Sequence, residues 1–168
     1  MSENGPELTI IACENAGRGF YLHNREDSTS ILQGFTITNS YHHDWGGGMY
    51  TYNSSPTVSN CMFTWNWVYI WDGGDMSNDG GNPTVTNCTF SENSATGGSG
   101  MLNINDSNPT VTNCILWGDM CNEISNYTGS YPIVTYSDVR EGCEALIKIT
   151  MFYHVVPIHL NPRSEMLD

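Results

Sequence analysis

The chain has very little positive charge. It contains 5 lysine and arginine residues against 18 aspartate and glutamate residues, which gives a formal net charge of −13 at pH 7. Proteins that bind nucleic acids or anionic membrane surfaces neutralise phosphate groups with clustered lysine and arginine. The composition therefore argues against nucleic acids and anionic membranes as partners, and it permits binding of cations or neutral polymers.

Long apolar runs are also absent. A membrane-spanning helix takes about 18 apolar residues or more, and no such run occurs. The first residues, MSENG, show no basic region followed by an apolar one, so no signal peptide is predicted. P-loop, dinucleotide-binding and G-x-S-x-G motifs are missing as well. What remains is a chain of 168 residues, which is one domain by length.

One short phrase occurs three times. It reads PTVSNCMF at 56–63, PTVTNCTF at 83–90 and PTVTNCIL at 109–116, so successive copies start 27 and 26 residues apart. A fixed period in this range is typical of a solenoid, in which each coil buries its apolar face against its neighbours. The repeat therefore predicts a stack of coils.

The phrase predicts a bend within each coil. The valine, cysteine and phenylalanine of V-x-N-C-x-F can all point inward only if the chain bends at the asparagine in the left-handed region, which asparagine tolerates and glycine favours. The earlier segment 32–37 aligns with the phrase if Gly34 takes the place of Asn60. This exchange is what a backbone requirement predicts.

Equivalent residues of stacked coils lie about 4.8 Å apart, so each column of the repeat forms a ladder. The expected ladders are an amide ladder at the turn (Asn60, Asn87, Asn113), a cysteine stack (Cys61, Cys88, Cys114) and an apolar stack (Phe63, Phe90, Leu116). Parallel stacked thiols match the disulfide dihedral poorly, and no C-x-x-C spacing indicates zinc. We therefore predict that the three cysteines are unpaired packing residues.

These ladders resemble those of right-handed parallel β-helix proteins. The closest resemblance is to repetitive β-helix proteins of bacterial cell surfaces, in which an SPTVTNCTF coil alternates with a GGGMY stretch, here residues 46–50. The resemblance covers roughly Leu8 to Val139 and implies the architecture of pectate lyases, polygalacturonases, phage tailspikes and autotransporter passengers. Such proteins are usually exported and longer, so we expect a mature piece of an extracellular or cell-surface protein.

We predict an all-β chain, a right-handed parallel β-helix of five to six coils over residues 1–139. Residues 132–139 look like a worn last copy, in which Tyr136 stands in the asparagine place. Residues 140–168 have neither glycine-rich turns nor the repeat. They are predicted to be an irregular cap for the open end or a non-native tail. An open-ended stack is also a candidate for end-to-end dimerisation.

The best functional signal is a cluster of aromatic residues. In WNWVYIW at 65–71 the rings alternate with smaller or polar residues, which is the period of a strand and sends them to one face. Exposed rings on a rigid surface are suited to stacking on sugars or apolar ligands. The alternative is a satellite core covered by the preceding loop. The predicted ligand-binding residues are Trp45, Trp65, Trp67, Tyr69 and Trp71.

A second candidate site is the loop that contains Ser40, His42, His43 and Asp44. One histidine held by Asp44 could act as base for Ser40 as nucleophile, as in esterases. Such trios are usually assembled from separate segments, so the competing interpretation is a solvated loop.

A third candidate is the acidic set Asp72, Asp75 and Asp79. Two carboxylates at the right separation hydrolyse glycosides, and clustered oxygens bind calcium. Asp72 and Asp75 are therefore the predicted glycosidase pair, and all three are the predicted calcium ligands. The competing interpretation is that these are turn residues. A pectate-lyase mechanism is poorly supported because the middle coils lack basic residues.

The leading functional hypothesis is an extracellular or surface module that binds carbohydrate or another exposed polymer through its aromatic face, without a required cofactor. The alternatives are a hydrolase (a glycosidase or an esterase) and a structural spacer from a longer adhesin. Whether the chain is an enzyme is left open.

Overall fold

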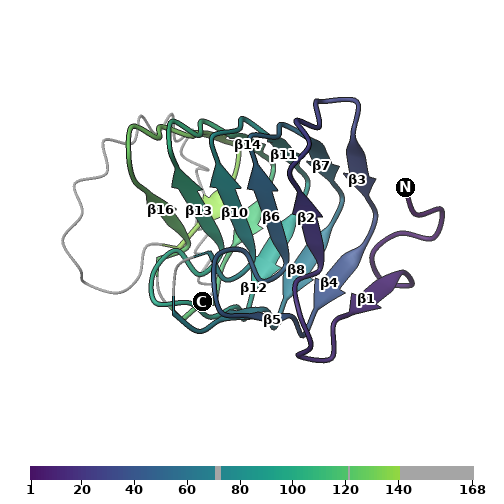
Figure 1. Cartoon of the computed structure of the whole chain (residues 1–168). Helices are drawn as coiled ribbons and strands as arrows, with labels where there is room; N and C mark the ends of the chain where they lie inside the picture. Colours follow the sequence, from purple (N-terminus) through teal and green to yellow (C-terminus); the bar gives the residue numbers. More distant parts are fainter. Residues whose placement is uncertain (71–72, 121, 141–168) are drawn as a thin grey trace, which may run out of the picture.

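The computed structural model describes residues 1–70, 73–120 and 122–140, and all regular structure in them is β-strand. The strands stack in parallel into three sheets that wind around a common core (Figure 1). One sheet contains β1 (Ile10–Ala12), β4 (Thr36–Thr38), β8 (Met62–Thr64), β12 (Thr89–Ser91), β15 (Ile115–Leu116) and β18 (Asp138–Val139). We call it the cysteine-side sheet, because its strands follow the Asn-Cys pairs.

The second sheet, the methionine sheet, contains β2 (Phe20–Leu22), β6 (Met49–Tyr52), β10 (Met76–Asp79), β13 (Met101–Ile104) and β16 (Ile124–Asn126). The third, the valine sheet, contains β3 (Ile31–Gln33), β7 (Thr57–Ser59), β11 (Thr84–Thr86), β14 (Thr110–Thr112) and β17 (Ile133–Thr135). Each coil runs from the methionine sheet through the valine sheet to the cysteine-side sheet. The prediction of a parallel solenoid of about five coils is confirmed.

The register confirms the predicted alignment of the coils. Leu32 pairs with Val58, which pairs with Val85, in the valine sheet. In the methionine sheet, Phe20 and Met76 both pair with Met49, as the GGGMY stretch predicts. The worn last copy also keeps the register, because Thr110 pairs with Ile133 at an offset of 23 residues.

The bend between the valine and cysteine-side sheets is left-handed in every coil that carries it. Its residues are Gly34 (φ 78°), Asn60 (51°), Asn87 (54°), Asn113 (53°) and Tyr136 (50°). The exchange of glycine for asparagine and the alignment of Tyr136 are therefore both confirmed. A backbone requirement, and not the side chain, fixes this column.

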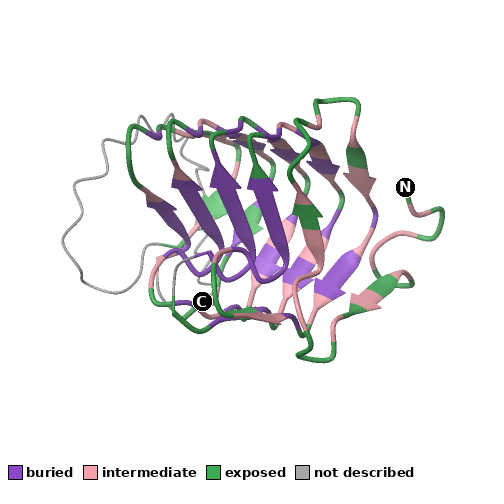
Figure 2. Ribbon diagram, viewed as in Figure 1, coloured by how far each residue is buried: buried purple, intermediate pink, exposed green. Residues whose placement is uncertain are grey.

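The core consists of stacked identical side chains, buried in the middle coils (Figure 2). Phe63 and Phe90 stack with centroids 5.0 Å apart and planes 2° from parallel. Cys61, Cys88 and Cys114 are buried free thiols, as predicted. Each of these thiols donates to the carbonyl two residues before it.

The amide ladders are not where the sequence predicted them. The side chains of Asn60, Asn87 and Asn113 are exposed, and in the described residues they form no hydrogen-bonded ladder. The ladders lie inside the solenoid instead. One runs from Asn78 Nδ2 to Asn103 Oδ1 (2.9 Å) and from Asn103 Nδ2 to Asn126 Oδ1 (2.8 Å). Asparagine is used at this bend because its backbone tolerates the left-handed conformation. Its side chain points to solvent there.

A fourth, two-stranded sheet lies at the corner where the chain leaves the cysteine-side sheet. It pairs β5 (Tyr41–His42) with β9 (Trp67–Val68), so the segment predicted as an irregular loop contains a short strand.

In the described part of the chain, no helix is long and apolar enough to span a bilayer. Except for Arg140, the predicted cap or tail lies outside the described residues.

Candidate functional site

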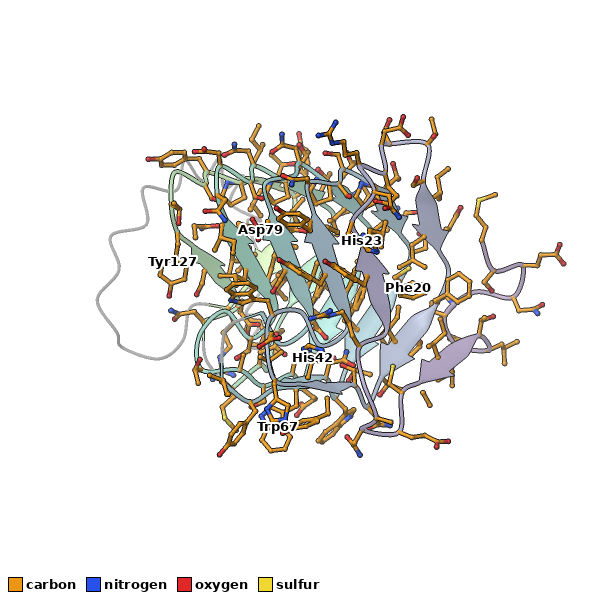
Figure 3. All side chains as sticks on the ribbon, in the orientation of Figure 1. Phe20, His23, His42, Trp67, Asp79 and Tyr127 are labelled. Carbon is orange, nitrogen blue, oxygen red and sulfur yellow. The ribbon has the colours of Figure 1, made fainter. Side chains whose placement is uncertain are left out.

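The two-stranded sheet carries a group of aromatic side chains that we call the aromatic edge: Tyr41, His43, Trp65, Trp67 and Tyr69. Trp65 is 62% exposed, Trp67 46% and Tyr69 57%, whereas Asn66 and Val68 between them are buried. The predicted alternation therefore holds, and these three side chains are not covered as a satellite core. Figure 3 shows Trp67 on the outside of the solenoid, below the strands of the three sheets.

Four of the rings form a grid across two coils. Between coils, the ring centroids of Tyr41 and Trp67 are 5.2 Å apart and those of His43 and Tyr69 are 6.1 Å apart. Within a coil, Trp67 and Tyr69 are 6.1 Å apart, and Tyr41 and His43 are 5.4 Å apart. The backbone pairing of β5 with β9 sets the spacing between coils. Neighbouring rings are tilted or edge-on to each other, with planes 59° to 90° apart, so the grid is a stepped aromatic surface.

Trp65 occupies a second left-handed bend. Its φ is 57°, and the equivalent residues of the neighbouring coils are Asn39 (54°), Glu92 (59°) and Gly118 (87°). A bulky residue in this conformation is an outlier, because its Cβ crowds the following carbonyl. Burial does not compensate for the strain, since most of the ring is in solvent.

Trp45, another of the predicted aromatic residues, lies away from this edge. Trp45 is half-buried and packs beside Tyr50 on the methionine sheet, with ring centroids 6.1 Å apart. Arg18 fixes this corner by donating to the carbonyls of Trp45 (2.6 Å) and Gly46 (2.7 Å). Trp71 lies outside the described residues.

The structure does not assemble the Ser40, His42 and Asp44 trio. Ser40 is fully buried, and its Oγ has no hydrogen-bond partner in the described residues. His42 Nδ1 accepts from the backbone N–H of Asp44 (3.1 Å) and lies 3.1 Å from Arg18 Nη2. Burial, and then the Arg18 guanidinium, lower the pKa of His42. His43 faces Tyr41 and Tyr69 instead.

The predicted acidic set does not form one site either. Asp75 is fully buried inside the solenoid, where its Oδ1 accepts from Asn66 Nδ2 (2.6 Å). Asp79 accepts instead from the Tyr50 hydroxyl (2.9 Å) and from Asn105 Nδ2 (2.8 Å). Asp72 lies outside the described residues, so the pair that it would form with Asp75 stays a prediction. In the described residues, no three His, Cys, Asp or Glu side chains are arranged to hold a metal ion.

Two further carboxyl groups were missed by the sequence reasoning. Asp119 and Glu123 are buried inside the last described coils and perturb each other's pKa. Alignment of the coils would have found them, because Asp119 lies in the column of Asn66 and Asn93. Their burial makes them unsuited to contact an external polymer.

Comparison with known proteins places this architecture in a family. A model described as a right-handed beta helix region matches residues 4–140. No curated protein and no solved structure gives a match. The parallel sheets, the inward ladders and the family match agree over the same part of the chain. This chain belongs to the right-handed β-helix family.

Proposed function

We propose that the chain is a non-catalytic binding module that takes a carbohydrate polymer on the aromatic edge. The observation that carries this proposal is the grid of four neighbouring rings across β5 and β9, of which His43, Trp67 and Tyr69 are exposed and Tyr41 is half-buried. Aromatic faces stack on the apolar faces of sugar rings, and a rigid surface loses little conformational entropy when it binds. The strained and exposed Trp65 supports the proposal, because strain without a packing benefit often marks a functional position.

The charge of the chain favours a neutral polymer. Arg18 is already engaged by backbone carbonyls, and Arg140 lies over the ring of Trp117 at 5.7 Å. An acidic polysaccharide would meet a protein of net charge −13 without a cluster of cations to pair with its carboxylates. The surface setting of the module, extracellular or on a cell, is part of this proposal.

The test is a binding and turnover screen on the purified chain. Tryptophan fluorescence is followed while neutral and acidic polysaccharides are added, with and without calcium. Saturable binding of a neutral polymer is expected, and Trp67→Ala should weaken it at least tenfold. Tyr131→Ala is the matched control, because Tyr131 is 71% exposed but is not part of the aromatic edge.

Other outcomes favour the alternatives. Hydrolysis of a glycoside that is lost in Asp75→Asn would favour the glycosidase hypothesis, although Asp75 is buried. Calcium-dependent binding would favour a metal site that includes Asp72. Ester cleavage that is lost in Ser40→Ala would favour the esterase hypothesis. If neither binding nor turnover is observed, the structural-spacer hypothesis is favoured.

A further inference from the structure

Three carboxyl groups lie inside the solenoid, away from the aromatic edge. Asp75 is 0% exposed, Glu123 2% and Asp119 8%. Asp75 immediately precedes β10, Glu123 immediately precedes β16, and Asp119 follows β15. Carboxyl groups are rarely this buried unless they are paired, because water stabilises the charged form strongly.

Two columns of the coil stack place Asp119 and Glu123 opposite each other and Asp75 two coils away. One contains Ser40, Asn66, Asn93 and Asp119, and the other contains Gly48, Asp75, Gly100 and Glu123. Residues of the two columns face each other within a coil, as the bond from Asn66 Nδ2 to Asp75 Oδ1 shows. In the last described coil, the carboxyl group of Asp119 therefore faces the carboxyl group of Glu123. In the other coils, a serine or an asparagine of the first column faces a glycine or an aspartate of the second.

Three buried oxygens of these carboxyl groups are without a hydrogen-bond partner. Asp119 Oδ1 accepts from the backbone N–H of Asn93 (2.7 Å) and from its Nδ2 (3.0 Å). Asp75 Oδ2, Asp119 Oδ2 and Glu123 Oε2 have no donor partner in the described residues. A Cβ at Gly100 would lie 2.8 Å from Asp119 Oδ2 and 3.6 Å from Glu123 Oε2, so these two oxygens converge on the space that the glycine leaves.

Within residues 1–70, 73–120 and 122–140, no cation pairs with these carboxyl groups. Glu92 also acts on Asp119, and because it is acidic as well, its charge raises the pKa of Asp119 further. Asp75 experiences the charges of Asp119 and Glu123. Arg140, the described arginine of the last coil, lies over the exposed ring of Trp117 on the outside. Protons are therefore the simplest source of the missing donors and of charge neutrality.

We propose that Asp119 and Glu123, which face each other in the last described coil, form a proton-dependent latch that holds this coil to its neighbour while the pair keeps its proton and loosens it as the solution turns alkaline. A protonated Glu123 donates to Asp119 and supplies the donor that these oxygens lack. Burial first, and then the neighbouring carboxyl groups, raise the pKa of Asp75 and Glu123, the latter to about 8. Burial is also the main cause that raises the pKa of Asp119.

The direction of the pH effect follows from linkage. An unfolded glutamate has a pKa of about 4.3, so between that pH and about 8 the folded state holds a proton on Glu123 that the unfolded state has lost. The stabilisation that this proton provides is fully present below the pKa of Glu123 in the unfolded state. It is lost as the pH rises through the pKa of Glu123 in the folded state. The latch is thus closed in acid and open above pH 8.

The experiment measures unfolding by denaturant at a series of pH values from 5 to 9. The unfolding equilibrium constant of the wild type is expected to rise about tenfold or more across this range. Glu123→Gln keeps a donor and removes the titration, so it should flatten the pH dependence. Asp138→Asn, which removes an exposed charge from the same coil, should leave the dependence unchanged.

A second measurement does not depend on the variants folding. Infrared spectra of the wild type should show a protonated carboxyl band that persists to about pH 8 and then disappears. The latch is rejected if all carboxyl groups ionise below about pH 6, or if Glu123→Gln retains the slope of the wild type. Failure of polymer binding leaves this inference intact, because it involves no residue of the aromatic edge.

Discussion

Left-handed bends decide which residue types each corner of the solenoid accepts. At the first bend the coils use glycine and asparagine, except that Tyr136 closes the series. At the second bend Asn39, Glu92 and Gly118 share the conformation of Trp65. Tyr136 and Trp65 are both strained and exposed, but only Trp65 is followed directly by the strand that carries Trp67.

We predict that Trp65→Asn stabilises the fold and weakens binding. Asparagine relieves strain of about 0.5–1 kcal/mol at the bend, whereas loss of the ring should weaken polymer binding at least fivefold. Chemical denaturation and fluorescence titration measure the two effects.

The control for this prediction is Tyr136→Asn, which should stabilise by a similar amount without altering binding. If Trp65→Asn instead destabilised the protein, Trp65 would be a packing residue. Its place in the aromatic edge would then need another explanation.

Sequence reasoning predicted the bends and the outward aromatic residues but not the internal polar ladders. The Asn-Cys pairs recur at nearly constant spacing, so their column is evident. The facing pairs are harder to align, because Asn66 precedes Asp75 by nine residues, Asn93 precedes Gly100 by seven and Asp119 precedes Glu123 by four. Insertions in the loop between two fixed positions hide a contact that the coil geometry preserves.

At the scale of the element, the methionine sheet combines an apolar stack with a polar one. The methionine sheet has buried Met49, Met76 and Met101 in one inward row and the Asn78–Asn103–Asn126 ladder in the other. The polar row requires each amide to donate to the next coil, so it fixes the register more strictly than a row of methionines does.

Asn103→Ala is expected to destabilise the protein by about 2–4 kcal/mol. It leaves Asn78 Nδ2 without its acceptor and Asn126 Oδ1 without its donor. Urea denaturation measures the change. Asn87→Gly is the control at an exposed asparagine, and it should change stability by less than about 0.5 kcal/mol because glycine keeps the bend. Equal losses in the two variants would contradict a structural role for the internal ladder.

The cysteine column allows a chemical prediction. Cys61, Cys88 and Cys114 are buried and free, whereas Cys13 is partly exposed. We expect an alkylating reagent to modify Cys13 in the native protein and to modify the three stacked cysteines only after unfolding, because reagent access requires opening of the coils. Peptide mapping by mass spectrometry identifies the modified sites. Rapid native modification of Cys88 would show that the coils open locally.

At the scale of the whole molecule, the coils behave as exchangeable units. Described strands pair only with the equivalent strands of adjacent coils, so no strand pairing in the described residues ties the first coil to the last. Stability is then approximately the sum over neighbouring coils, and the loss of one internal coil should be tolerated.

Deleting residues 83–108 removes one coil and joins Asn82 to Pro109, which keeps the register. This shortened protein is expected to keep a β-rich circular dichroism spectrum, with a lower melting temperature because one layer of core is lost. Deleting Thr112 as well shortens the fixed spacing between Val111 and the bend at Asn113, so Val111 and Cys114 cannot both point inward and that variant should not fold. Similar behaviour of both deletions would argue against the register as the determinant of the fold.

Stacking by adjacent coils alone has a mechanical consequence. A pulling force along the axis of the solenoid is expected to separate one pair of neighbouring coils at a time, because each described strand pairs only with strands of directly adjacent coils. The chain should therefore lengthen in steps as single coils peel away, each step releasing about 26 residues or roughly 90 Å of extended chain. A solenoid of this kind acts as an extensible tether that yields gradually, coil by coil, and does not break at a single load.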